Sequence, residues 1–115
     1  MKITQLGKAL DKEKYIIDKK SKSFSTTEDN LVLDFSDEYG WVFKTGSDCT
    51  FDTGSDCTFD TGSDCTFDTG YGCTFNTGSN CVAVRRDIYE VIEIPEGKKI
   101  KINEYGTKGW KEAEK

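Results

Sequence analysis

Hydrophobic and polar positions repeat every eight residues through the middle of the chain. The sequence reads TGSDCTFD three times from Thr45 to Asp68 and continues as TGYGCTFN and TGSNCVAV up to Val84. In the central copies, position five is Cys, position seven is Phe, and a Thr stands between them. This alternation predicts a strand with one buried face. The TGSD segment supplies turn residues, with Gly available for positive φ, so each octad is predicted to form one turn and one short strand.

The same register extends beyond the near-identical copies. Leu33 and Phe35, and then Trp41 and Phe43, occupy positions five and seven before them, and Tyr89 follows at position five after them. The register therefore covers eight octads, from residue 29 to residue 92. Degenerate outer copies are expected, because the terminal repeats of an array must cap it.

One octad is too short to close around a core, so we predict that two octads form each coil. The predicted fold is all-β: a two-sided β-solenoid of four coils, ~4.8 Å apart, with an N-terminal cap and a C-terminal β-hairpin cap. An antiparallel meander with TGSD hairpin loops is the alternative. It is less favoured, because its Phe and Cys face would stay uncovered. The predicted core consists of Leu33, Phe35, Trp41, Phe43, Cys49, Phe51, Cys57, Phe59, Cys65, Phe67, Cys73, Phe75, Cys81, Ala83, Tyr89 and Val91.

Residues 1–28 form the predicted N-terminal capping segment of this single domain. Their spacing does not decide between a short helix around 7–14 and a strand at 14–18. The basic stretch from Lys19 to Ser25 is interpreted as a solvated polar loop.

Residues 93–115 form the predicted C-terminal cap. We expect a hairpin across Pro95–Gly97, with Tyr105 and Trp110 packed near it, followed by a frayed tail at 111–115. Cross-strand pairs in this hairpin would join Glu90 and Glu93 to Lys99 and Lys101.

Composition narrows the classes of function. The chain has 115 residues, a net charge of −5 and no histidine. Its acidic balance argues against direct nucleic-acid binding, and it has no apolar run long enough to span a membrane. The five cysteines, one in each octad from Cys49 to Cys81, lack the C-x-x-C pairs of metal sites. We interpret them as small buried hydrophobes in a reduced compartment. With no signal peptide, a cytoplasmic location is expected, or a virion-associated one for a bacteriophage protein.

Aspartates at positions four and eight are the weak metal candidates. Their G-x-D turns resemble the β-roll repeats of secreted toxins, which bind Ca²⁺, although this unit is shorter and lacks the paired glycines. A coil of two octads would stack Asp52 on Asp68, between Ser36 and Val84, and Asp60 between Lys44 and Asn76. The calcium candidates are Asp48, Asp56, Asp64, Asp52, Asp60 and Asp68.

The sequence offers little support for other functions. The outward threonines Thr50, Thr58, Thr66 and Thr74 could resemble an antifreeze array, but β-propensity on a solvated strand explains them. The acidic surface leaves open the hypothesis that the chain acts as a decoy for a DNA-binding protein. Catalytic motifs are absent from the sequence, so we expect neither an enzyme nor a cofactor.

The stretch NLVLDFSDEYGWVFKTGSDCTFDTGSDCTF resembles octapeptide-repeat sequences of small uncharacterised bacterial and bacteriophage proteins. The resemblance covers residues 29–92, implies a β-solenoid and implies no catalytic residue. Three identical octads fit either a recent duplication or an engineered repeat number. The expected function is therefore a non-enzymatic structural or protein-interaction module that forms homo-oligomers through the solenoid ends, with the calcium and decoy hypotheses as alternatives.

Overall fold

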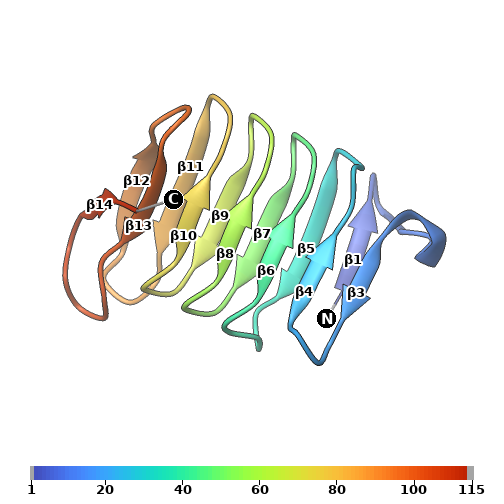
Figure 1. Cartoon of the computed structure of the whole chain (residues 1–115), viewed down its shortest axis with the longest axis horizontal. Coiled ribbons are helices and arrows are strands. Elements are labelled where there is room, and N and C mark those ends of the chain that lie inside the picture. Colours follow the sequence, from blue (N-terminus) through green and yellow to red (C-terminus); the bar gives the residue numbers. More distant parts are fainter. Residues whose placement is uncertain (1, 114–115) are drawn as a thin grey trace.

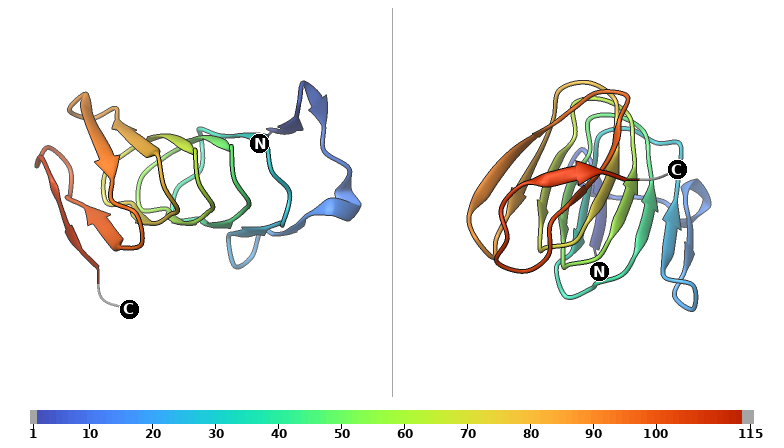
Figure 2. Two further views of the ribbon diagram at one scale, coloured as in Figure 1. Left: turned by 90° about the horizontal axis from the view of Figure 1, so that it is seen from above. Right: turned by 60° about the vertical axis from the view of Figure 1, so that its left-hand side comes forward.

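A computed structural model describes residues 2–113 of the chain, and it forms a β-solenoid of about 4 turns. Two seven-stranded sheets lie face to face along the long axis (Figure 1). The molecule measures 38 × 26 × 26 Å. Between Ser23 and Arg85, successive strands alternate between the sheets, so this part of the chain winds as a flattened coil (Figure 2).

The strands of each sheet follow one another along the long axis of the solenoid. The first sheet contains β12 (Glu90–Ile94), β11 (Cys81–Arg85), β9 (Thr66–Thr69), β7 (Thr50–Thr53), β5 (Leu31–Phe35), β1 (Lys2–Gln5) and β2 (Lys8–Ala9). The second contains β14 (Trp110–Glu112), β13 (Lys99–Ile102), β10 (Thr74–Asn76), β8 (Thr58–Asp60), β6 (Val42–Lys44), β4 (Ser23–Ser25) and β3 (Ile16–Asp18). A 3₁₀ turn, η1 (Lys12–Lys14), precedes β3.

The central coils repeat every 16 residues, as predicted. Parallel pairing sets Phe51 beside Phe67 in the first sheet and Phe59 beside Phe75 in the second. Because residues 16 apart stack directly, identical side chains form columns along the axis. This parallel pairing excludes the antiparallel meander for the repeats.

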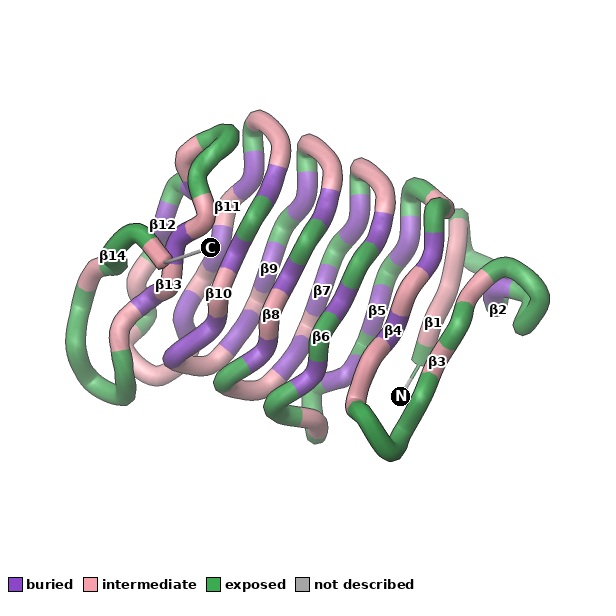
Figure 3. Tube along the Cα trace, viewed as in Figure 1, coloured by how far each residue is buried: buried purple, intermediate pink, exposed green. Residues whose placement is uncertain are grey.

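Phenylalanine columns fill the space between the sheets. Phe51 and Phe67 stack with ring centroids 5.0 Å apart, and Phe59 and Phe75 stack at 5.1 Å. Phe51 also meets Phe59 of the opposite sheet edge-on at 5.1 Å. Such aromatic pairs each contribute about 0.5–1.5 kcal/mol beyond their buried area. The purple bands in Figure 3 show the resulting alternation of buried and exposed positions.

Position one of the five octads that begin with Thr-Gly is a third inward position, which the sequence interpretation missed. Thr53 follows Phe51 by two residues and is fully buried. Its hydroxyl donates to the carbonyl oxygen of Gly54 at 3.2 Å, which offsets the cost of burying it. The same bond recurs in the other buried threonines at this position: Thr45, Thr61, Thr69 and Thr77.

The N-terminal coils depart from the predicted register. Leu33 pairs with Phe51, 18 residues ahead, so Leu33 takes position seven where position five was predicted. A shift of two residues keeps the same face inward, and Leu33 and Phe35 are still buried. The polar loop predicted for Lys19–Ser25 is wrong at its end, because Phe24 is buried in β4 and pairs in parallel with Phe43.

Residues 85–92 do not form the last octad that the sequence register predicted. Tyr89 is 86% exposed and Val91 is 66% exposed, so their assignment to the core is wrong. The chain turns back after β11, and β12 pairs with it antiparallel, with Ala83 opposite Ile92. This reversal points Ile92 and Ile94 inward instead.

Antiparallel hairpins close the C-terminal end, but they are not the predicted hairpin. β12 pairs with β11 in the first sheet, whereas β13 pairs with β10 in the second, so Pro95–Gly97 crosses between the sheets. The expected pairing of Glu90 and Glu93 with Lys99 and Lys101 is therefore wrong. β13 and β14 form the second hairpin, which includes Trp110 and part of the tail predicted to fray. Residues 114–115 lie outside the described range.

Candidate interaction surfaces

The turn aspartates have a backbone role. Asp48, Asp56 and Asp64 adopt left-handed φ angles of 59°, 60° and 59°, and Gly72 and Asn80 follow the same pattern at 70° and 59°. Asp, Asn and Gly are the residues that tolerate this conformation most readily. The residue choice at position four is therefore explained by the turn, and the three aspartates are exposed.

Glycine at position two is required for close approach, and not for the positive φ that we predicted. A Cβ on Gly62 would clash with the Ser47 Oγ of the previous coil. The backbone N–H of Gly62 donates to the carbonyl oxygen of Gly46 at 3.2 Å, so the turns stack as closely as the strands do. Serine hydroxyls continue the ladder, since the N–H of Ser63 donates to Ser47 Oγ at 3.0 Å.

The position-eight aspartates form a short column on the first sheet. Asp52 stacks on Asp68 as predicted, but Asp34 and not Ser36 precedes them. Arg86 bridges the column at 2.5 Å from Asp52 and 3.6 Å from Asp68. This cation reduces the repulsion between the stacked carboxylates.

On the second sheet, Asp60 lies between Lys44 and Asn76 as predicted. Among residues 2–113, no cluster of three or more metal-ligating acidic, cysteine or histidine side chains is found. The aspartates that suggested calcium are therefore spread along two faces and two rows of turns.

The cysteines form two inward columns. Cys49, Cys65 and Cys81 stack in one, and Cys57 and Cys73 in the other; all five thiols are free and buried. The hydrogen bond between Cys65 and Cys49 raises the pKa of Cys65 and lowers the pKa of Cys49 to about 7. The bond between Cys73 and Cys57 acts in the same way, with the pKa of Cys57 lowered to about 7, and burial raises the pKa of Cys81. All five side chains are buried between the sheets, so these columns serve packing.

The outward threonines divide into two short pairs. Thr50 lies beside Thr66 on the first sheet, and Thr58 beside Thr74 on the second. Val32 and Val82 flank the first pair. Each face thus carries a column of two threonines between other residue types.

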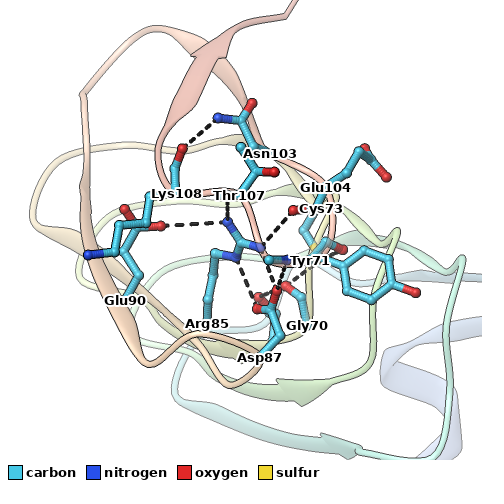
Figure 4. A network of polar contacts seen from close by, with 12 residues as sticks. Gly70, Tyr71, Cys73, Arg85, Asp87, Glu90, Asn103, Glu104, Thr107 and Lys108 are labelled. Carbon is cyan, nitrogen blue, oxygen red and sulfur yellow. Dashed lines mark hydrogen bonds and ion pairs between the residues drawn. The ribbon is translucent and has the colours of Figure 1, made fainter.

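The C-terminal end is closed by a fully buried arginine (Figure 4). Arg85 takes the place of the repeat threonine, in register with Thr69. Its guanidinium binds both carboxylate oxygens of Asp87, at 3.1 and 2.6 Å. It also donates to the carbonyl oxygens of Glu104 at 3.1 Å and Thr107 at 2.5 Å. These bonds fasten the loop between β13 and β14 over the last coil.

The acidic partners of Arg85 hold the same loop. Asp87 accepts a hydrogen bond from the Gly106 N–H at 3.0 Å, and Glu90 accepts one from the Gly109 N–H at 3.0 Å. Burial alone raises the pKa of Asp87, but the Arg85 guanidinium and the Gly106 amide hold that pKa below its usual value. The network, which we call the Arg85 lock, was not predicted. A charged residue at a repeat position otherwise held by Thr was the available signal.

The N-terminal end is less completely covered. Ile3 of β1 and Ile17 of β3 come from opposite sheets and, with Tyr15, are only partly buried against the core. A hollow of about 540 Å³ lies over them. Its lining consists of Ile3, Lys12, Tyr15, Ile16, Ile17 and Lys19. We call this the N-terminal hollow; sequence reasoning had treated the segment only as a cap.

Exposed apolar side chains gather at the two ends. Leu6 and Ile16 lie at the N-terminal end. The C-terminal end exposes Tyr89, Val91, Tyr105 and Trp110. The middle of the solenoid exposes only Val32, Tyr39 and Val42 among the described large hydrophobic residues. Six of these nine exposed side chains among the described residues therefore lie on the caps, four of them at the C-terminal end.

No protein-family model, curated protein or solved structure matches this chain. The part of the chain that the structure describes has no helix with the length and apolarity needed to cross a membrane.

Proposed function

We propose that the chain is a non-enzymatic interaction module that binds partners, including a second copy of itself, through the ends of its solenoid. The observation that carries the proposal is the concentration of exposed apolar side chains on the two caps. Apolar patches that remain exposed on a folded protein commonly mark interaction sites.

The edges of the sheets support the same proposal. β3 and β14 end the second sheet, while β2 and β12 end the first. Such edge strands present unpaired N–H and C=O groups to an incoming strand. The packed Phe, Cys and Thr columns between them provide a rigid spacer, because each coil is held by hydrogen bonds to the next.

Sedimentation velocity from about 10 µM to 1 mM tests the proposal. Ile16→Lys changes the N-terminal end and Tyr89→Lys the C-terminal end, while Thr58→Lys is a matched control on a repeat face. We expect association that increases with concentration, that Tyr89→Lys reduces and that Thr58→Lys leaves unchanged. Association that Thr58→Lys removes would place the interface on a face, and a chain that is monomeric throughout would contradict self-association.

A further inference from the structure

The two ends differ in how they are closed, and this difference indicates what binds at the open one. The Arg85 lock ties a loop across the C-terminal end, where Ile92, Ile94, Ile100 and Ile102 are buried. At the N-terminal end, Leu10 is buried, but Ile3 and Ile17 stay partly accessible beneath the N-terminal hollow. The view from above in Figure 2 shows the blue N-terminal segment crossing that end.

An edge strand borders the N-terminal hollow. β3 pairs with β4 on one side, and among the described residues no strand pairs with its other side. Ile17 points toward the core opposite Phe24, while its neighbour Ile16 is 73% exposed. An added strand could therefore extend the second sheet and place an apolar side chain over the hollow.

The charge around the N-terminal hollow indicates which kind of strand would bind there. Residues 2–22 contain seven lysines and three carboxylates, whereas residues 28–76 contain eleven carboxylates and one lysine. Lys12 and Lys19 line the N-terminal hollow, and Lys8 and Lys14, together with the carboxylate of Asp11, line a second hollow of about 470 Å³. Within residues 2–113, none of these four lysines lies within ion-pair distance of a carboxylate.

The same charges disfavour an end-to-end contact with a second copy at this site. Two N-terminal ends brought together would oppose their lysine clusters, which is unfavourable. The C-terminal end has a nearly balanced charge, with eight basic and seven acidic residues over 85–115, so it offers little complementarity. A strand with an apolar centre would fill the hollow, and acidic residues on the same strand would pair with the lysines.

We propose that the N-terminal hollow and the edge of β3 bind an extended acidic peptide segment with an apolar centre, taken from a different protein. This inference rests on the proposed function, since it names the partner of one of the two ends. Main-chain hydrogen bonds to β3 would supply affinity, and Lys12 and Lys19 would supply selectivity.

Fluorescence polarisation with a labelled peptide tests this inference on the full chain. The probe is Glu-Asp-Val-Ile-Val-Asp-Glu, compared with a version carrying lysine at its acidic positions and one carrying Gly-Ser-Gly at its centre. We expect the probe alone to bind, with affinity that falls as salt screens the lysines. Lys12→Glu with Lys19→Glu should weaken binding about tenfold or more, a change that corresponds to ~1.4 kcal/mol. Lys111→Glu, at the opposite end, should leave binding unchanged.

A second readout locates the peptide. Bound probe should slow amide hydrogen exchange at Ile16–Asp18 and leave Trp110–Glu112 unaffected. Equal binding of the lysine version would overturn the inference. Equal binding of the Gly-Ser-Gly version, or of a short single-stranded oligonucleotide, would also overturn it, because the site would then recognise negative charge alone. If no peptide binds while end substitutions alter sedimentation, the acidic partner is wrong and the proposed function stands. If the end substitutions change neither sedimentation nor peptide binding, both this inference and the proposed function are wrong.

Discussion

At the scale of single residues, position four of the octad is defined by backbone conformation. Asp48, Asp56 and Asp64 hold φ near +60°, where Gly72 and Asn80 also lie. A left-handed residue with a bulky side chain is strained, since its Cβ approaches the following carbonyl oxygen. The set of Asp, Gly and Asn at one repeat position was a visible signal for this turn, but we attributed positive φ to the glycine at position two.

Substitutions at Asp64 test this assignment. Asp64→Gly should leave the free energy of unfolding nearly unchanged, because Gly adopts positive φ without strain. Asp64→Val should lower it by about 1–2 kcal/mol, because a β-branched residue is strained there. Urea unfolding measures both. Equal losses in the two variants would show that the carboxylate, and not the backbone, is what position four requires.

At the scale of elements, the repeat strands and the caps follow different rules. Alternation of Cys, Thr and Phe was sufficient to predict β7, β8, β9 and β10 and their inward faces. The caps were harder to predict, because chain reversal after Arg85 exchanges the faces and moves Val91 outward. Nothing local in the sequence shows that Glu104 and Thr107 lie beside Arg85; their carbonyl oxygens meet it only after the chain crosses between the sheets.

The acid dependence of the Arg85 lock follows from Asp87. Its pKa is lowered in the folded chain, so its contribution to stability is complete above its unfolded pKa of about 3.9 and is lost as pH falls through the folded pKa. Asp87→Asn should therefore be less stable than the wild type at pH 7, and the difference should shrink at pH 3. Asp37→Asn, which neutralises an exposed carboxylate, is the control and should show a small difference at both values. Thermal unfolding at the two pH values measures this, and a constant deficit for Asp87→Asn would contradict the role of its charge.

At the scale of the whole molecule, the solenoid converts a pattern of eight residues into a coil of 16. Two octads are needed because each strand must face another across the core, as Phe51 faces Phe59 at 5.1 Å. This geometry places Thr50 next to Thr66 and sends Thr58 to the opposite face. It also gives the molecule two chemically different ends, the closed one at Arg85 and the open one at Ile17, which sequence periodicity alone could not distinguish.

The measurement that tests the coil most directly is a pair of double-mutant cycles in urea unfolding. The first combines Thr50→Lys with Thr66→Glu, and the second combines Thr50→Lys with Thr58→Glu. In a coil of 16 residues the first pair consists of adjacent side chains and should couple by about 0.2–1 kcal/mol, while the second pair should not couple beyond error. Coupling between positions 50 and 58, with none between 50 and 66, would contradict the solenoid.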